Sequence, residues 1–222
     1  LGDVDATVVA RIYERSGGNP LLVEELCAAG ADGDSAGLSP LADVMLARFL
    51  RLSEPARNLV RAVAVAGSTV SETELAGVVG PGAAEFAPAL REALDLHVLV
   101  RSDNAIGFRH VLTADAVYGE LLGVERTELH RRWAGELESV PAAIPRLAYH
   151  WYEAGEYEPA FDANLTAARD AGAVLAFDSA YHHFRRALAV WDRVANPAAR
   201  AGSSRVDLCL AAAEAANWSG DP

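Results

Sequence analysis

The stretch of sequence that decides the fold is Val98-Leu99-Val100-Arg101-Ser102-Asp103-Asn104-Ala105-Ile106-Gly107-Phe108-Arg109. Two short runs rich in strand-forming residues, 98–101 and 106–109, flank the mostly polar residues 102–105, and this pattern predicts a short β-hairpin with a polar turn. On both sides of the hairpin, apolar residues recur at helical spacing. We therefore expect a mainly α-helical fold with one short β-hairpin.

The segment before the hairpin predicts helices that end in recognisable signals. Ser53 is placed to cap a helix that runs to Gly67, and Ser71 and Glu74 form the S-x-x-E pattern of a capping box. Further helices are predicted over 40–52 and 83–96. Helices followed by a hairpin are the order of a winged helix, so residues 53–123 are predicted to form that domain.

The segment after the hairpin predicts antiparallel helices. Helical spacing covers 112–122, 126–140, 145–154, 159–171, 176–194 and 203–218. Residues 148–161 show the large–small alternation and turn of a tetratricopeptide-like repeat, and a second incomplete unit begins at Ala180. Two incomplete units do not establish a period. Residues 124–222 are nevertheless predicted to be a tetratricopeptide-like segment of antiparallel helical hairpins.

The charge of the chain restricts its chemistry. The formal net charge is −12, and every basic residue is arginine, because the sequence contains no lysine. A phosphate-binding loop of the G-x-x-x-x-G-K-[ST] type needs a lysine, and so does Schiff-base chemistry. The acidic balance also disfavours nucleic acid. We therefore expect no enzyme within this chain and no direct binding of nucleic acid by it.

The composition indicates a folded protein of the cytoplasm. Hydrophobic residues make up 51% and charged residues 23% of the chain. No uninterrupted apolar run reaches the length of about 18 residues that a membrane helix requires, and the first residues lack the pattern of a signal peptide. Cys27 and Cys209 are too few and too far apart for a disulfide framework or a metal site. We expect reduced cysteines, no metal and no membrane partner.

Three motifs resemble one family of regulators. The string Arg15-Ser16-Gly17-Gly18-Asn19-Pro20-Leu21-Leu22-Val23-Glu24-Glu25-Leu26 resembles the R-S-x-G-N-P-F-x-x-E-E-L segment of signal-transduction ATPases with numerous domains, and of the large LuxR-type regulators among them. Phe108-Arg109-His110-Val111-Leu112, with 116–118, Arg126, Leu129 and His130, resembles the stretch that ends the family's winged helix. Ala148-Tyr149-His150-Trp151, before Ala154-Gly155, resembles the start of its helical arm.

This resemblance implies a division into three parts and a nucleotide site. Residues 1–52 would be the last lid helices of a nucleotide-binding region, ahead of the winged helix and the helical arm. The turn made by Gly18, Asn19 and Pro20, after Arg15, would lie beside the adenine of ADP or ATP. His110 would face the β-phosphate of ADP. Two departures are that Leu21 replaces the family's usual Phe, and that the motif at His110 reads F-R-H-V where some relatives have M-H-D.

Each of these features also has a simpler interpretation. A Gly-Gly-Asn-Pro break is commonly an ordinary turn between helices, His110 can form hydrogen bonds within its own domain, and Arg109 can pair with Asp115. The adjacent His182 and His183 point to different faces of a helix and so cannot form an i, i+4 metal pair. The helix at 83–96 carries one arginine against three acids, which disfavours a DNA-reading role.

Two functions therefore remain. The leading one is a regulatory fragment that relays nucleotide state between an adjoining ATPase core and a helical arm. The arm would sense a protein or small-molecule effector, and an output domain outside this chain would control transcription if the parent is of the LuxR type. The alternative is a helical-repeat scaffold for protein–protein interaction that has no link to nucleotide. The motif from Arg15 to Leu26 separates the two, because a plain scaffold has no reason to carry it.

Overall fold

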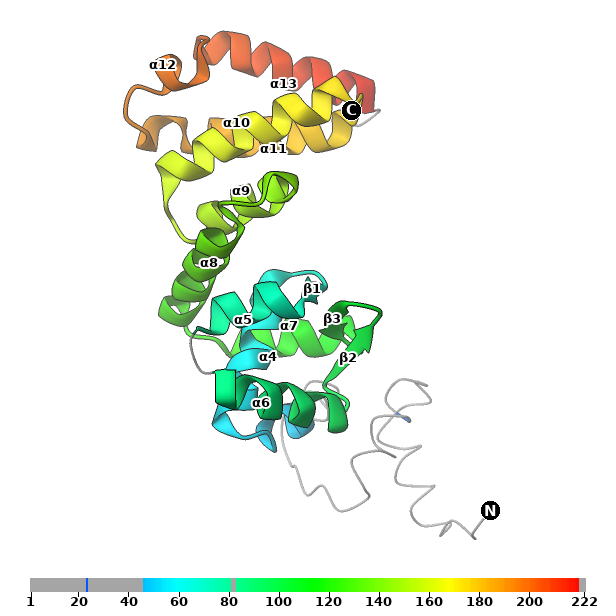
Figure 1. Ribbon diagram of the computed structural model, residues 1–222. Coiled ribbons are helices and arrows are strands. Elements are labelled where there is room, and N and C mark those ends of the chain that lie inside the picture. The colour runs from blue at the N-terminus through cyan, green and yellow to red at the C-terminus, as the bar shows by residue number, and fades with distance from the viewer. Residues whose placement is uncertain (1–22, 24–45, 81–82, 220–222) are drawn as a thin grey trace, which may run out of the picture. The chain divides into compact units, whose positions relative to one another are not determined.

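A computed structural model describes residues 23, 46–80 and 83–219 of the chain (Figure 1). The described residues form two compact units that divide between Leu121 and Leu122, and each unit is considered by itself. Both units are largely helical, and the first also holds a small antiparallel sheet. The predicted mainly α-helical fold with a short β-hairpin is confirmed.

The first unit alternates helices with short strands. Its elements are α4 (Glu54–Ala66), β1 (Val70–Ser71), α5 (Glu72–Val79), α6 (Ala83–Asp95), β2 (Leu99–Ser102), β3 (Ala105–Phe108) and α7 (Val111–Glu120). The three strands are antiparallel in the order β1-β3-β2. The helices α4, α5 and α6 therefore precede the β-hairpin in this unit, and the assignment of residues 53–123 to a winged helix stays a prediction.

The hairpin differs from its prediction in the length of the turn. Ser102 pairs with Ala105, so the turn contains two residues, Asp103 and Asn104, and the predicted four-residue turn is wrong. Asp103 has a φ of 52°. Aspartate tolerates this left-handed conformation because its short side chain can bond locally, and the strands can therefore extend further toward the turn than the polarity of Ser102 suggested.

Strand β1 was not predicted. Val70 pairs with Ile106 and Ser71 with Ala105, which adds a third strand along β3. Gly107 makes room for the chain just before β1, because a Cβ atom at Gly107 would lie 2.8 Å from the γ-methyl carbon of Thr69. A strand of two residues has no visible period, so only its partner in the sheet identifies it.

Ser53 precedes α4 as predicted, but its side chain does not cap that helix. Its backbone N–H donates to Glu92 Oε1 at 2.7 Å, and its hydroxyl donates to Glu92 Oε2 at 2.5 Å. The predicted capping role is therefore wrong, because a carboxylate on α6 competes for the serine hydroxyl. The other end agrees with the prediction: Gly67 ends α4 with a φ of 67°, and its N–H donates to Ala64 O.

The capping box of α5 is confirmed. The hydroxyl of Ser71 accepts from the N–H of Glu74 at 3.2 Å, and Glu74 Oε2 accepts from the N–H of Ser71 at 2.8 Å. Two N–H groups at the start of the helix are satisfied in this way. The box fixes the start of α5 directly after strand β1.

Helix α4 forms the centre of the first unit and packs against α5, α6 and α7. Its residues Leu59 and Val60 are completely buried, and so are Leu75 of α5 and Ile106 of β3. Burial of such side chains is worth about 1.5–3 kcal/mol each. This shared core fixes the position of the β-hairpin relative to the start of α7.

The second unit is entirely helical within the described residues. Its elements are α8 (Gly123–Leu137), η1 (Pro141–Ala143), α9 (Ile144–Glu153), α10 (Tyr157–Ala173), α11 (Phe177–Val190), η2 (Trp191–Arg193), α12 (Pro197–Ala201) and α13 (Arg205–Ser219). The predicted helix 176–194 changes to a 3-10 turn at Trp191, and the short α12 was not predicted. Asn196 lies in the left-handed region with a φ of 51°, and Pro197 then begins α12.

Successive long helices pack side by side in this unit: α9 lies against α8 and α10, and α11 lies against α10 and α13 (Figure 1). The core between α10, α11, α12 and α13 is built from eight buried side chains: Phe161, Leu165, Ala187, Val190, Trp191, Val194, Ala201 and Leu208. Phe161 and Trp191 meet edge to face with their ring centres 5.7 Å apart. Across the described residues, no helix is both long enough and apolar enough to cross a membrane.

Candidate functional site

Four of the five predicted nucleotide-binding residues lie outside the described residues. These are Arg15, Gly18, Asn19 and Pro20. The fifth, His110, lies in the first unit. Their predicted meeting at one nucleotide therefore stays a prediction.

His110 occupies the junction between β3 and α7. It is the residue before the first turn of α7 and has extended backbone, with φ −134° and ψ 129°. Its carbonyl accepts from the N–H of Thr113, which begins the helix. The residue is half-buried, while the preceding Arg109 is exposed. The sheet and the helix together hold this short segment at the surface of the first unit.

The electrostatics of this junction favour an anion. The first turn of α7 carries no acidic residue. The N-terminus of a helix has a partial positive charge and free N–H groups. Arg109 adds a full positive charge beside it, and a histidine side chain can donate a hydrogen bond to a phosphate oxygen.

A second pair of motif residues meets in the core of the second unit. His130 on α8 and His150 on α9 approach with their Nδ1 atoms 2.9 Å apart. The two residues are 1% and 0% exposed. His130 belongs to the R-x-x-L-H stretch quoted above and His150 to the A-Y-H-W stretch. The two motifs thus form one buried contact between neighbouring helices.

Aromatic rings surround this histidine pair. The ring of Trp133 stacks on His150 with centres 5.9 Å apart, and Tyr149 meets His130 edge to face at 5.4 Å. Arg146 lies over the Trp133 ring and Arg186 over the Tyr149 ring. Aromatic contacts of this kind add about 0.5–1.5 kcal/mol each beyond the burial of area. The cluster fixes the packing of α9 on α8.

Both imidazoles are held in the neutral state. Burial lowers the pKa of His130 to about 4, and the charge of Arg126 acts in the same direction. Burial lowers the pKa of His150 to about 3, with further lowering by His130 and then by Arg146. Protonation of either ring would place a positive charge away from water and close to an arginine, which is unfavourable. Both rings of the pair are therefore uncharged near neutral pH.

Hydrogen bonding favours one arrangement of protons in the pair. Nε2 of His150 is buried and has no hydrogen-bond partner among the described residues. Buried N–H groups without an acceptor are rarer in proteins than unpaired acceptors. This favours a His150 that carries its proton on Nδ1 and donates it to Nδ1 of His130, whose own proton is then on Nε2.

The predicted helix boundaries were not enough to find this pair. The predicted helices 126–140 and 145–154 centre their connection between positions 142 and 143. In the structure α8 ends at Leu137 and α9 begins at Ile144, so the connection is centred near position 140, about ten residues from each histidine. Antiparallel helices with a short connection place residues at equal distances from the turn side by side. The contact therefore depends on the earlier end of α8.

The adjacent His182 and His183 differ in environment, as expected for neighbours on a helix. His183 is 6% exposed, and its Nδ1 lies 2.9 Å from Oδ1 of Asn164, which in turn donates to Ala160 O. Burial lowers the pKa of His183, with help from Arg186 and His182. His182 is exposed and lies 3.4 Å from Asp178. Among the described residues, no three His, Cys, Asp or Glu side chains are grouped to hold a metal ion.

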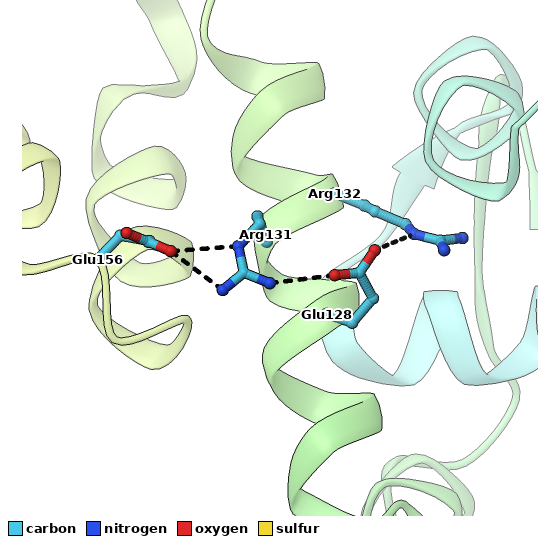
Figure 2. A network of polar contacts seen from close by, with 4 residues as sticks. All are labelled: Glu128, Arg131, Arg132 and Glu156. Atoms are coloured by element: carbon cyan, nitrogen blue, oxygen red, sulfur yellow. Dashed lines mark hydrogen bonds and ion pairs between the residues drawn. The ribbon is translucent and has the colours of Figure 1, made fainter.

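A network of ion pairs joins α8 to the residue before α10 (Figure 2). Arg131 donates from Nε and Nη2 to one oxygen of Glu156, at 3.2 and 3.0 Å, and from Nη1 to Glu128. Arg132 binds the second oxygen of Glu128 at 3.0 Å, and hydrogen bonds from Arg132 and then Arg131 lower the pKa of Glu128. Exposed pairs contribute at most about 1 kcal/mol each. The network links α8 to the turn ahead of α10.

Comparison with known proteins does not assign a family. No family model matches the chain, and no solved structure matches it. An uncharacterized protein of Rhizobium meliloti (strain 1021) is 31% identical over 134 residues. The aligned stretch covers 53% of this chain and 13% of that relative. The chain therefore spans only a small part of the length of that relative.

Proposed function

We propose that this chain is a regulatory part of a nucleotide-controlled signalling ATPase of the LuxR type, and that it relays nucleotide state between an ATPase core and a helical arm. Three motifs support the proposal, because they follow one another in the order of that family. The fold supports it as well: a unit with helices and a β-hairpin is followed by antiparallel helices. The similarity to a small part of a much longer bacterial protein is compatible with a chain of several domains.

The observation that carries the proposal is the position of His110. The F-R-H stretch runs from the end of β3 into the start of α7, so Arg109 and His110 lie where a helix N-terminus attracts an anion. A phosphate presented by an adjoining core would be met by a positive charge, a helix terminus and an imidazole at one point. Such a contact would form when the core holds a nucleotide and would be absent when the core is empty.

The packing of α7 would couple this phosphate contact to the rest of the first unit. Helix α7 lies against α4 and β3, and its residue Val117 is completely buried. A phosphate that binds the start of α7 in one state of the core biases the position of this helix in that state alone. Differential binding of this kind is what shifts a two-state equilibrium.

The partners follow from this role. They are the adjoining ATPase core, an output domain elsewhere in the polypeptide, and a protein or small molecule at the helical arm. Nucleic acid is not a partner of this segment in the proposal, because α6 carries Glu85, Glu92 and Asp95 against Arg91. Glu92 is moreover engaged by Ser53.

The alternative function is a helical scaffold that binds another protein without any link to nucleotide. The antiparallel helices of the second unit suit that role equally well, since helical arrays present extended surfaces. The two functions differ in one property: only the relay responds to ADP or ATP.

The test is ADP binding to the complete gene product, measured by calorimetry, with and without the substitution His110→Ala. Loss of a hydrogen bond to a charged phosphate costs about 1.5–3 kcal/mol, so we expect ADP to bind at least about tenfold more weakly. His182→Ala serves as the control, because His182 is an exposed histidine of the second unit. It should leave ADP affinity unchanged.

Two outcomes decide between the functions. If the complete gene product binds no adenine nucleotide, the relay is wrong and the scaffold takes its place. If it binds ADP equally well with His110→Ala and with His182→Ala, the nucleotide does not act through the start of α7.

A further inference from the structure

Two neighbouring arginines of α11 lie over tyrosine rings. The guanidinium carbon of Arg186 is 5.5 Å from the centre of the Tyr149 ring on α9, and that of Arg185 is 5.5 Å from the centre of the Tyr181 ring on α11. Among the described residues, neither arginine forms a hydrogen bond or an ion pair. Both side chains therefore carry a positive charge that no carboxylate in this part of the chain neutralises.

Other arginines of the second unit differ from these two. Four exposed arginines are paired with carboxylates: Arg131 with Glu128 and Glu156, Arg132 with Glu128, Arg200 with Asp162, and Arg205 with Asp192. The chain contains 31 acidic residues against 19 basic ones, so carboxylates are plentiful. Arg185 and Arg186 nevertheless leave their N–H groups open to a partner.

The helices that carry these contacts are poor in acidic residues. Helix α11 has one, Asp178, which lies in its first turn and 3.4 Å from His182. Helix α9 has one, Glu153, which is its last residue. Arg146 lies about one turn before Tyr149 on α9 and adds a third arginine. Positive charge therefore collects on α9 and α11, although the net charge of the chain is −12.

We propose that an arginine surface, formed by Tyr149, Tyr181, Arg185 and Arg186, binds an acidic peptide segment of a partner protein. A guanidinium group over an aromatic ring keeps the N–H groups at its edge free to form paired hydrogen bonds with a carboxylate. The ring also restricts the arginine before the partner arrives, so less conformational entropy is lost on binding. The inference rests on the proposed function in that it names the class of partner at the helical arm.

The arrangement favours a peptide over other anions. Arg185 and Arg186 follow each other on a helix, where successive side chains point about 100° apart. One small anion would therefore meet one guanidinium group, whereas a peptide with several carboxylates can meet both. Nucleic acid is disfavoured, because its phosphates would also approach the acidic residues of α10, which packs against both α9 and α11.

The experiment measures binding of a fluorescein-labelled peptide of alternating glutamate and serine to the full 222-residue chain, by fluorescence anisotropy. A labelled peptide of equal length with glutamine in place of glutamate is the control ligand. We expect the glutamate peptide to bind at least about tenfold more tightly, because hydrogen bonds between charged groups are stronger than those to neutral groups. No nucleotide is present, so failure of this test leaves the nucleotide relay to be decided by ADP binding alone.

Substitutions locate the binding surface. Arg186→Gln should weaken binding of the glutamate peptide at least about tenfold. Arg185→Gln, at an exposed position, should also weaken it and gives a second variant should Arg186→Gln fail to fold. Arg132→Gln is the matched control, because it removes the same charge from an exposed arginine that is already bound to Glu128. It should leave the affinity unchanged, and far-UV circular dichroism verifies the fold of each variant.

Other results overturn the proposal. Equal affinity for the glutamate and glutamine peptides means that this chain recognises no acidic segment. Equal weakening by Arg186→Gln and Arg132→Gln means that the peptide responds to the overall charge and not to the arginine surface. Displacement of the peptide by an equal concentration of glutarate identifies a small dicarboxylate as the ligand. Tighter binding of a labelled single-stranded oligodeoxynucleotide identifies nucleic acid.

Discussion

His130 and His150 pair two neutral imidazoles in the core between α8 and α9, and this makes the second unit sensitive to acid. Unfolded histidine has a pKa of about 6.5, whereas burial lowers the two values to about 4 and about 3. As the pH falls below about 6.5, these histidines therefore bind protons in the unfolded chain and stay neutral in the folded chain. Stability is fully present above that pH and is lost as the pH falls toward the folded values.

The predicted loss is on the order of 2 kcal/mol per histidine between about pH 7.5 and about pH 5. Urea unfolding followed by tryptophan fluorescence at both pH values measures it. His150→Gln should remove the contribution of one histidine, and His130 and His183, whose pKa values burial also lowers, should account for the pH difference that remains. His182→Gln, at an exposed site, should not change the difference. An equal pH difference in all three proteins would show that the buried pair is not its source.

At the scale of single elements, the capping box of α5 gives a prediction for the first unit. Ser71→Ala removes the acceptor for the N–H of Glu74 and the hydroxyl that donates to Glu74 Oε2, while the bond from the backbone N–H of residue 71 to that carboxylate can remain. We expect a loss of about 1 kcal/mol in the free energy of unfolding. Chemical unfolding followed by far-UV circular dichroism measures the change.

Ser68→Ala is the matched control for this element. Ser68 is also a serine close to β1, but it is exposed, and its hydroxyl makes one long contact of 3.4 Å to Thr69 O. Its substitution should change stability by less than about 0.5 kcal/mol. Equal losses in the two variants would contradict a specific role for the box.

The elements also show how far sequence determines this fold. The capping box and the helix from 54 to 66 were predictable because their signals are local: a serine and a glutamate three residues apart, or an apolar stripe that ends at a glycine. Strand β1 and the role of Ser53 were not, because a partner distant in the sequence decides each of them. Ile106 pairs with Val70, and Glu92 takes the hydroxyl of Ser53.

The candidate site also contains residues whose position the sequence predicted and residues whose position it did not. Sequence placed His110 at the end of a strand and before a helix, and the structure places it between β3 and α7. The contact between His130 and His150 was not predicted, because α8 ends at Leu137, three residues before its predicted end, and this shift sets which residues face each other across the turn. The residues Arg15, Gly18, Asn19 and Pro20 stay predictions from sequence alone.

At the scale of the whole molecule, the two units can be followed with separate probes. All four tryptophans, Trp133, Trp151, Trp191 and Trp218, belong to the second unit. Tryptophan fluorescence therefore reports the unfolding of that unit, while circular dichroism reports the helices of both. Units with separate cores can unfold independently.

We predict that Ser71→Ala shifts part of the unfolding curve measured by circular dichroism and leaves the curve measured by fluorescence unchanged. Lowering the pH should shift the fluorescence curve, through the histidine pair. The wild-type chain measured with both probes is the reference for each comparison. A shift of both curves by the same amount in Ser71→Ala would show that the two units unfold as one.

The contact of Ser53 with Glu92 also has a mechanical consequence. Two hydrogen bonds anchor the start of α4 to α6. Tension applied to the chain ahead of Ser53 therefore acts on α4 and α6 together, and fraying of the first turn of α4 requires these two hydrogen bonds to break first.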